Sequence, residues 1–283
     1  MTETNHNSIG WIDGIWGPTN KLSIPICDRG LTLGDGLFET ILIYKGLPKL
    51  LTSHLSRMRS GAAILKMAAP PSENWLQPLI EEGISRASLQ NNNGILRLNW
   101  SRGNNLSRGI NLSNTTTSQS QHRFWLEINS GEPSFQCLSS IISRNERRNP
   151  YSKLNHCKTF GYSQSIQARI EANLAGFDEA LLLSYSGEIC CGATANLLVH
   201  RHNQWLTPHS QSGCLQGIMR QQGINSGVVK EARINKMPEE GDKWLLINSL
   251  GCQPIHTVNQ QSLKLFSNPK NFWLSLIEYN CSH

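Results

Sequence analysis

Hydrophobic and polar positions alternate in several short stretches of the N-terminal half, and this spacing predicts strands. Residues 37–44, 94–100 and 123–129 alternate in this way and are rich in β-branched and aromatic side chains. Between residues 9 and 16, the turn sequence Ile12-Asp13-Gly14 separates two apolar stretches and predicts a hairpin. We therefore expect a sheet here. The glycine-rich segment 28–36 is expected to be a loop that delivers the chain to the edge of that sheet.

Other stretches carry apolar residues at helical spacing. Residues 53–67 follow this spacing behind a candidate serine N-cap at Ser53, and residues 73–89 follow it after the break at Pro70-Pro71. A third helix is expected over residues 163–174, and a short one opens at Gly217. The polar, low-complexity residues 113–121 are expected to form a mobile surface loop.

The sequence Gly131-Glu132-Pro133-Ser134 is the best candidate for a domain linker, because an apolar strand ends before it and another begins after it. This places a small N-terminal α/β domain at residues 1–131 and a larger C-terminal domain at residues 132–283. Within the second domain, alternating patterns predict short strands, at residues 137–142, 179–183, 195–200 and 243–248. The fold class is therefore mixed α/β in two domains.

The composition favours a small anionic partner over nucleic acid or a membrane. The formal charge is +6, but lysine and arginine are scattered along the chain and form no basic stripe. A mild positive balance suits an anionic small molecule. No apolar run approaches the roughly 20 residues that span a bilayer.

The eight cysteines contain no CxxC pair, and no histidine cluster stands at metal-ligand spacing. We therefore expect no metal. The first residues have neither a basic region nor an apolar stretch, so no secretory signal is visible. Together these features predict free thiols in a reducing cytoplasm.

Candidate chemistry begins with Lys158, which stands just before a helix in a segment with few other charges. A lysine that is partly desolvated, or that lies beside other cations, becomes a usable nucleophile and base. Arg57, the helix opening at Gly217 and the hydroxyl of Ser249 supply the groups that hold a phosphate. Taken singly, each is more typical of a solvated surface, a cap or a turn.

Eight segments in a fixed order give the chain a recognisable pattern, and this pattern is similar to that of the class IV aminotransferases. The resemblance implies pyridoxal phosphate as cofactor and a homodimer. It also implies a two-domain fold type IV architecture, in which the C-terminal domain is the cofactor-binding domain and the cofactor lies in the interdomain cleft. The segments are Asp28-Arg29-Gly30 with Gly34-Asp35-Gly36-Leu37-Phe38-Glu39-Thr40, His54-Leu55-Ser56-Arg57, Ser101-Arg102-Gly103, Lys158-Thr159-Phe160-Gly161-Tyr162, Gly176-Phe177-Asp178-Glu179-Ala180-Leu181, Ala195-Asn196-Leu197, Gly217-Ile218-Met219-Arg220 and Asn248-Ser249-Leu250.

Carried over residue by residue, the resemblance implies that Lys158 forms the Schiff base with the cofactor and moves protons. It also implies that Arg57, the backbone amides of Ile218 and Met219, and Ser249 hold the phosphate. Met219 stands where many members of the family have threonine, so a hydroxyl contact is lost while the amide remains.

The chain departs from the family at Cys191. Counting back from Ala195-Asn196, this is the position at which the family usually has the glutamate that contacts the pyridine nitrogen. A thiol keeps that nitrogen protonated less well than a carboxylate does. Either the enzyme is impaired or its reaction needs less help from the ring, and we favour the second hypothesis.

Within the family, the pattern looks most like the aminodeoxychorismate lyases, which release pyruvate from 4-amino-4-deoxychorismate and leave 4-aminobenzoate, a folate precursor. In this interpretation Arg102 and Arg108 bind substrate carboxylates, and Thr40 lies at the substrate, where it or Tyr162 assists proton transfer. Two alternatives remain: an aminotransferase for branched-chain or D-amino acids, and a protein that binds pyridoxal phosphate without catalysis.

Overall fold

The computed structural model describes residues 8–104, 109–110 and 121–279. The described chain forms two compact units. Unit 1 contains the residues up to Glu132 together with Cys157–Gly161, and unit 2 contains Pro133–His156 and the residues from Tyr162 onward. Arg108 and most of the loop expected at residues 113–121 lie outside the described residues.

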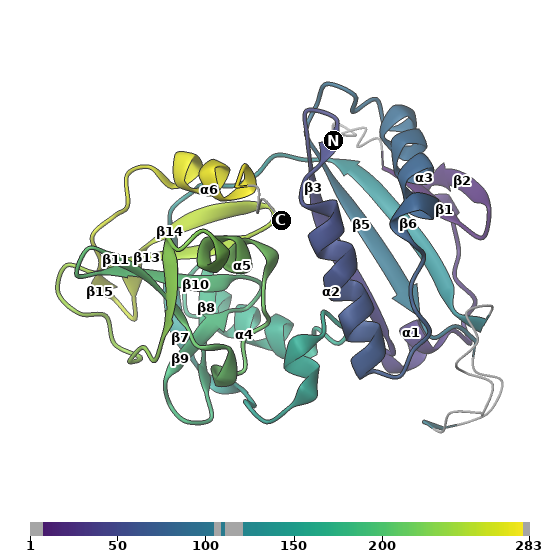
Figure 1. The fold of residues 1–283 in the computed structure, drawn as a ribbon. Helices are drawn as coiled ribbons and strands as arrows, with labels where there is room; N and C mark the ends of the chain where they lie inside the picture. The colour runs from purple at the N-terminus through teal and green to yellow at the C-terminus, as the bar shows by residue number, and fades with distance from the viewer. Residues whose placement is uncertain (1–7, 105–108, 111–120, 280–283) are drawn as a thin grey trace. The chain divides into compact units, whose positions relative to one another are not determined.

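Unit 1 is built on one antiparallel sheet in the order β2-β1-β6-β5-β3-β4 (Figure 1). The hairpin and the three strands expected from the alternation of polarity are all present in it. Its strands are β1 (Ile9–Ile12), β2 (Ile15–Pro18), β3 (Gly36–Tyr44), β4 (Leu47–Pro48), β5 (Gly94–Ser101) and β6 (Arg123–Ser130).

Three α-helices accompany this sheet: α1 (Arg29–Leu33), α2 (Leu51–Ile64) and α3 (Glu73–Arg86), besides the short 3-10 helix η1 (Thr19–Lys21). The glycine-rich segment was expected to be a loop, but it forms α1, because the Asp28 carboxylate caps the helix by accepting from the amide of Gly30. The serine cap expected at Ser53 is also wrong. Helix α2 begins after Leu50, whose backbone is left-handed with φ 56°, and no side chain caps it.

One face of the unit 1 sheet is apolar, and α2 and α3 cover it. Alternate residues of β3 and β5 point to this face, and the apolar ones include Leu37, Ile41, Leu96 and Leu98, each less than 2 % exposed. The opposite face carries the alternate set, in which Thr40 pairs with Arg97 across the two strands. The sheet therefore separates a buried helical side from a polar side.

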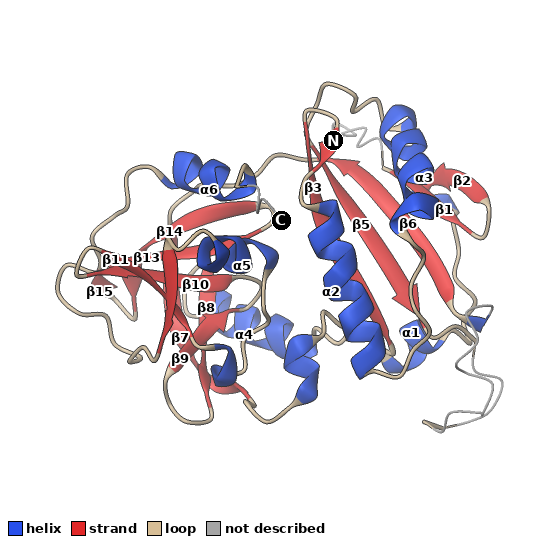
Figure 2. Cartoon of the chain, in the orientation of Figure 1, coloured by secondary structure: helices blue, strands red, loops and turns tan. Residues whose placement is uncertain are grey.

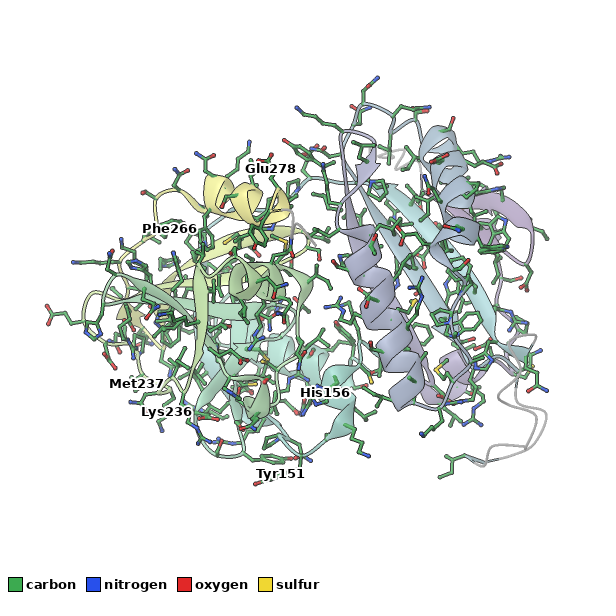
Figure 3. All side chains as sticks on the ribbon, in the orientation of Figure 1. Tyr151, His156, Lys236, Met237, Phe266 and Glu278 are labelled. Carbon is green, nitrogen blue, oxygen red and sulfur yellow. The ribbon has the colours of Figure 1, made fainter. Side chains whose placement is uncertain are left out.

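Five residues return from unit 2 to unit 1 and join the edge of β3. Thr159 bridges to Leu37, the amide of Phe38 donates to the carbonyl of Lys158 (2.9 Å), and the amide of Phe160 donates to the carbonyl of Gly36 (3.1 Å). The segment just before, which includes η3 (Lys153–His156), belongs to unit 2. Figure 3 labels two of its residues, Tyr151 and His156.

Unit 2 contains a second sheet in the order β12-β11-β10-β13-β14-β7-β8-β9. Because β9 pairs with β10 as well as with β8, the six strands from β10 to β9 close on themselves. The strands are β7 (Leu138–Arg148), β8 (Glu179–Ser184), β9 (Ile189–Gly192), β10 (Asn196–Arg201), β11 (Gln204–Pro208), β12 (Val229–Ala232), β13 (Lys243–Asn248), β14 (Gly251–Val258) and β15 (Gln261–Ser262), which pairs with β14.

The helices of unit 2 pack on this sheet, as Figure 2 shows by colour. The helices expected at residues 163–174 and after Gly217 are confirmed as α4 (Ser163–Leu174) and α5 (Ile218–Asn225), and they are joined by α6 (Pro269–Ile277) and the short η4 (Ser210–Ser212). Helix α4 packs on β7 and β8, whereas α6 packs on β14 and α5. No helix among the described residues has the length and apolarity needed to cross a membrane.

Candidate active site

In unit 1, Lys158 lies beside a second cation. Its Nζ atom is 4.3 Å from the centre of the Phe38 ring, and the guanidinium carbon of Arg97 is 3.8 Å from the same centre. Both cations are attracted to the electron-rich ring. The backbone hydrogen bond from the amide of Phe38 to the carbonyl of Lys158 holds the lysine backbone next to this ring. An amine and a guanidinium therefore meet at one aromatic side chain.

Arg97 belongs to a polar row on the sheet face opposite the helices. Its Nε donates to Oδ1 of Asn99 (2.8 Å), and Nδ2 of Asn99 donates to Oε1 of Glu127 (3.4 Å). Thr40, which was expected to lie at the substrate, stands directly opposite Arg97 on β3. Arg97 was not among the residues selected from the sequence. Its signal was an arginine at a polar position of a strand that is otherwise apolar.

On the helical side of the same sheet, Glu39 joins two residues of α2. The carboxylate accepts from Nε of Arg57 (2.8 Å) and from Nη2 of the same guanidinium (2.5 Å), and it bonds Nδ1 of His54 (2.7 Å). Glu39 is completely buried, and His54 is 1 % exposed. Arg57, expected to bind phosphate, is thus oriented by a buried carboxylate that the sequence did not single out.

The charges in this group set the protonation states. Burial alone would raise the pKa of Glu39, but the charge of Arg57 and the hydrogen bond from His54 outweigh it and lower this pKa to about 2. Desolvation lowers the pKa of His54, with the charges of Arg57 and Lys158 adding to the effect against the pull of Glu39. Near neutral pH the group is therefore a carboxylate, a guanidinium and a neutral imidazole.

The guanidinium of Arg102 is engaged in hydrogen bonds within the protein. Its Nε donates to Asp35 (2.8 Å), and its two terminal nitrogens donate to the carbonyls of Lys66 (3.0 Å) and Leu65 (2.7 Å). It is 5 % exposed. These contacts give Arg102 a role in holding the loop after β5, and they do not support the substrate contact expected for it. Arg108, the other expected arginine, lies outside the described residues.

In unit 2, the amides of Ile218 and Met219, which were expected to bind phosphate, lie in the first turn of α5, near Asn196. Helix α5 begins after Gly217, and no side chain caps its first turn, which contains the amides of Ile218 and Met219. The Asn196 amide donates to the carbonyl of Leu215 (2.8 Å), just before that turn. A side-chain carbon added at Gly217 would lie 2.0 Å from Oδ1 of Asn196, so only glycine fits there.

Ser249 lies in the same part of unit 2. It follows β13, which pairs with β10 so that Ile247 stands opposite Asn196. Helix α5 packs against β13 as well. The turn after β13 is shaped by Asn248, whose Oδ1 accepts from the amide of Leu250 (2.8 Å). Uncapped helix amides and a serine hydroxyl on neighbouring elements are suited to holding a phosphate group.

Cys191 lies on β9, where it is buried and stands opposite Asn196 on β10. No carboxylate takes its place. Glu188 lies outside the strand, before β9 begins, and Glu179 on β8 is engaged by Arg169. The neighbouring cation is Arg148 at the end of β7, which also interacts with Tyr162. Cys191 is therefore a buried strand residue opposite Asn196, and its assignment to the glutamate position of the family stays a prediction.

A separate cavity of about 540 Å³ opens in unit 1, and its lining is mostly aromatic. The rings of Trp11, Trp75 and Phe124 lie 5.7–6.0 Å apart in edge or tilted contacts. None of the residues expected to bind cofactor or substrate lines this cavity.

The residues present suit a cofactor that carries an aldehyde and a phosphate. Lys158 supplies an amine in unit 1. Unit 2 supplies the uncapped amides of α5, with a cradle at Gly217 that a Cβ would fill. This donor set matches pyridoxal phosphate in chemistry.

The fold is that of the fold type IV transaminases. It matches the fold IV transaminase CpuTA1 from Curtobacterium pusillum with a TM-score of 0.80, at 19% identity and over 96% of this chain and 100% of that one. The model of the family described as amino-transferase class IV matches residues 36–258. The chain therefore belongs to the class IV aminotransferase family, and the cofactor of this family is pyridoxal phosphate.

Relatives on both sides of the family resemble the chain. It is 26% identical over 229 residues to branched-chain-amino-acid aminotransferase-like protein 2 of Arabidopsis thaliana, covering 76% of this chain and 38% of that protein. It is 23% identical over 193 residues to the aminodeoxychorismate lyase of Bacillus subtilis, covering 68% of this chain and 64% of that protein. The chain thus spans less than two thirds of the length of each, and these relatives do not separate a lyase from an aminotransferase.

Proposed function

We propose that this protein is a pyridoxal-phosphate-dependent lyase that converts 4-amino-4-deoxychorismate to 4-aminobenzoate and pyruvate. In this role Lys158 carries the cofactor, and the amides of Ile218 and Met219, together with Ser249 and Arg57, bind its phosphate. The likeness to the Bacillus subtilis lyase supports the proposal.

The observation that carries the proposal is the polar row beside Lys158. Arg97, Asn99 and Glu127 form a hydrogen-bonded series on one face of the unit 1 sheet, and Thr40 stands opposite Arg97. A branched-chain amino acid brings an apolar side chain, which offers these polar groups neither a charge nor a hydrogen bond. A substrate with two carboxylates satisfies them instead, because a guanidinium binds a carboxylate through paired hydrogen bonds.

The chemistry assigns the proton transfers to Lys158. Bound pyridoxal phosphate withdraws electrons from the carbon that bears the substrate amine and so makes its proton acidic. With the cofactor bound, Nζ of Lys158 would act as a free amine and remove that proton from C4 of the substrate. The C–O bond to the enolpyruvyl group then breaks, Nζ returns a proton, and pyruvate leaves. Arg97 holds a substrate carboxylate during both transfers.

The side chain at position 191 also favours a lyase. Sulfur is a weaker hydrogen-bond acceptor than a carboxylate oxygen, so Cys191 activates the cofactor ring less than a glutamate would. Transamination depends on that activation for its driving force. Loss of the C4 proton from aminodeoxychorismate instead leads to an aromatic product. The stability of that product compensates for weaker electron withdrawal by the cofactor ring.

The test is a direct comparison of two reactions. The purified chain, loaded with pyridoxal phosphate, is given 4-amino-4-deoxychorismate, and 4-aminobenzoate and pyruvate are measured. In parallel it is given L-valine or D-alanine, and conversion of the cofactor to its pyridoxamine form is measured. We expect equal amounts of the two lyase products and a much slower amino transfer. Rapid formation of the pyridoxamine form without 4-aminobenzoate would assign the chain to the aminotransferases.

Substitution of Arg97 by methionine is expected to raise KM for aminodeoxychorismate by about 10- to 100-fold, because a charged hydrogen bond to a carboxylate contributes about 1.5–3 kcal/mol. The side chain that remains keeps its apolar contact with Phe38. Steady-state kinetics of 4-aminobenzoate release measures the effect.

The matched control for this variant is Arg59→Met, which removes an exposed arginine from α2 and should leave KM unchanged. An Arg97→Lys variant should lie between the two, because lysine keeps the charge but not the paired geometry. Equal KM values for Arg97→Met and Arg59→Met would show that Arg97 does not bind the substrate.

A further inference from the structure

Three cysteines form a buried cluster in unit 2. Cys190 and Cys191 are neighbours on β9, and Cys214 comes from the segment before α5; none of the three forms a disulfide, and all are at most 5 % exposed. The Cys190 sulfur lies 3.3 Å from the carbonyl oxygen of Ser212 and within hydrogen-bonding reach of the sulfurs of both other cysteines. The proposed lyase mechanism depends on which side chain stands at position 191. It explains neither why three cysteines are clustered here nor why an arginine, Arg148, lies beside them.

Arg148 is the cation of this cluster. One of its terminal nitrogens donates to the Gln164 amide oxygen (2.9 Å) and the other to the Ser165 hydroxyl (3.1 Å), so both acceptors are neutral. The guanidinium also hydrogen-bonds the sulfur of Cys191. Within the described residues Arg148 makes no ion pair with a carboxylate. A partly buried guanidinium is stabilised by an adjacent anion, and Cys191 is the acidic side chain to which it bonds.

We propose that Cys191 is a thiolate, ion-paired with Arg148, and that it serves as the buried negative charge for the ring nitrogen of the bound cofactor in place of a carboxylate. The second clause rests on the proposed function, whereas the first concerns the protein alone.

The charges on the neighbouring strands agree with this assignment. Glu179 on β8 is buried and paired with Arg169 of α4, so its charge is already balanced. That leaves the positive charge of Arg148 without a carboxylate of its own. An anion at Cys191 balances it, and the Cys190 thiol supplies a second donor to the same sulfur.

The protonation behaviour of the cluster points in the same direction. The hydrogen bond from Cys190 and the charge of Arg148 lower the pKa of Cys191 to about 6, although burial and the charge of Glu179 oppose them. The same bond raises the pKa of Cys190, which remains a thiol. The pKa of Cys214 is also lowered, through its hydrogen bond with Cys190. The other titratable group facing Arg148 is Tyr162.

If Cys191 is a thiolate, the replacement of the family's glutamate by cysteine keeps a negative charge at this position. At pH 7 a group with a pKa of about 6 is roughly tenfold more ionised than protonated. The position thus keeps the negative charge of a carboxylate and loses only its strong acceptor oxygens. The cofactor ring receives electrostatic support at neutral pH and loses it in mild acid, as Cys191 takes up a proton.

The test is an NMR titration of the full-length chain, isotopically labelled at the cysteine Cβ carbons, from about pH 5 to about pH 9. The Cys191 signal is assigned by its loss in Cys191→Ser. We expect it to titrate with a midpoint near 6. In Arg148→Gln the midpoint should rise toward the ordinary cysteine value of about 8.5. The matched control is Arg147→Gln, one residue earlier on β7, which should leave the midpoint unchanged.

Cys252 provides an internal reference, because burial raises its pKa to about 12 and its signal should stay constant. A wild-type Cys191 signal that remains a thiol up to pH 8 would overturn the proposal, whether or not Arg148→Gln folds. The second clause is tested by the visible absorbance of the bound cofactor. Its pH dependence should change in Cys191→Ser and be restored in Cys191→Asp, and equal spectra in all three proteins would refute the ring contact.

These measurements separate the inference from the proposed function. A protein that makes 4-aminobenzoate but whose Cys191 stays protonated refutes the inference alone. A protein whose Cys191 titrates near pH 6 but that releases no 4-aminobenzoate refutes the lyase assignment and leaves the ion pair standing.

Discussion

In a Lys158→Ala variant, release of 4-aminobenzoate is expected to fall by a factor of at least about 10²–10⁴, the usual contribution of a positioned proton-transfer group. The loss should exceed this range, because in the proposed function the same amine also binds the cofactor covalently. The yellow absorbance of the bound cofactor should disappear as well. Both effects follow from the place of the amine beside Phe38 and Arg97.

Two further measurements identify the amine. Lys153→Ala removes an exposed lysine of η3, five positions earlier, and should keep full activity and colour. Borohydride reduction of the wild-type protein, followed by proteolysis and mass spectrometry, should find the cofactor attached to the peptide that contains Lys158. Attachment to a different lysine, or a Lys158→Ala protein that stays yellow and active, would contradict the assignment.

The second large effect is on stability. Replacement of Glu39 by glutamine is expected to lower the free energy of unfolding by about 3–5 kcal/mol, because it removes the anion from a buried ion pair and leaves the Arg57 charge uncompensated. Glu39 is completely buried and also accepts from His54, so water cannot replace the lost charge. Urea denaturation at pH 7 measures the change as a lower midpoint.

The matched control is Glu82→Gln on α3, which breaks an exposed pair with Arg86 and should cost less than about 1 kcal/mol. Equal losses in the two variants would show that the buried group is not a stabilising ion pair.

The free energy of unfolding should depend on pH through Glu39 and His54. The folded pKa of Glu39, about 2, lies below its unfolded value of 4.5. The stability contributed by this carboxylate is therefore fully present above about pH 4.5 and is lost as the pH falls toward 2. His54 adds a loss at higher pH. Its folded pKa lies below 6.5, so the unfolded chain binds a proton first and stability begins to fall below pH 6.5. Glu39→Gln should lack the first of these two losses.

The regular elements were predictable because their side chains repeat with the period of the structure. The strands β3, β5 and β6 and the helix α4 show clear alternation or helical spacing and are where the sequence puts them. Short elements were not found in this way. Helix α1 has five residues and depends on one capping carboxylate, Asp28, rather than on any repeat. Strands of two to four residues, such as β9 and β12, are too short to show a period.

The candidate site was predictable only where a residue carries its own chemistry. Lys158 and Cys191 could be selected in this way, but Glu39 could not, since the role of a carboxylate in an apolar strand depends on Arg57 and His54 of α2, the helix that packs on the same face. Arg102 and Arg97 show the same limit. Arg97 lies within β5 and Arg102 directly follows it, and only the three-dimensional contacts assign Arg102 to the protein's own carbonyls and Arg97 to the ring beside the lysine.

The return of Cys157–Gly161 to unit 1 has a consequence for dissecting the molecule. Cutting the chain after Glu132 would not yield two self-sufficient fragments, because the longer piece would contain Lys158 and the shorter one would contain β3, the strand that Lys158 and its neighbours join. The Lys158 amine is positioned only after residues 157–161 have joined β3, a strand that precedes them in the chain. The place of Lys158 beside Phe38 and Arg97 therefore exists only once both parts of one continuous polypeptide are present.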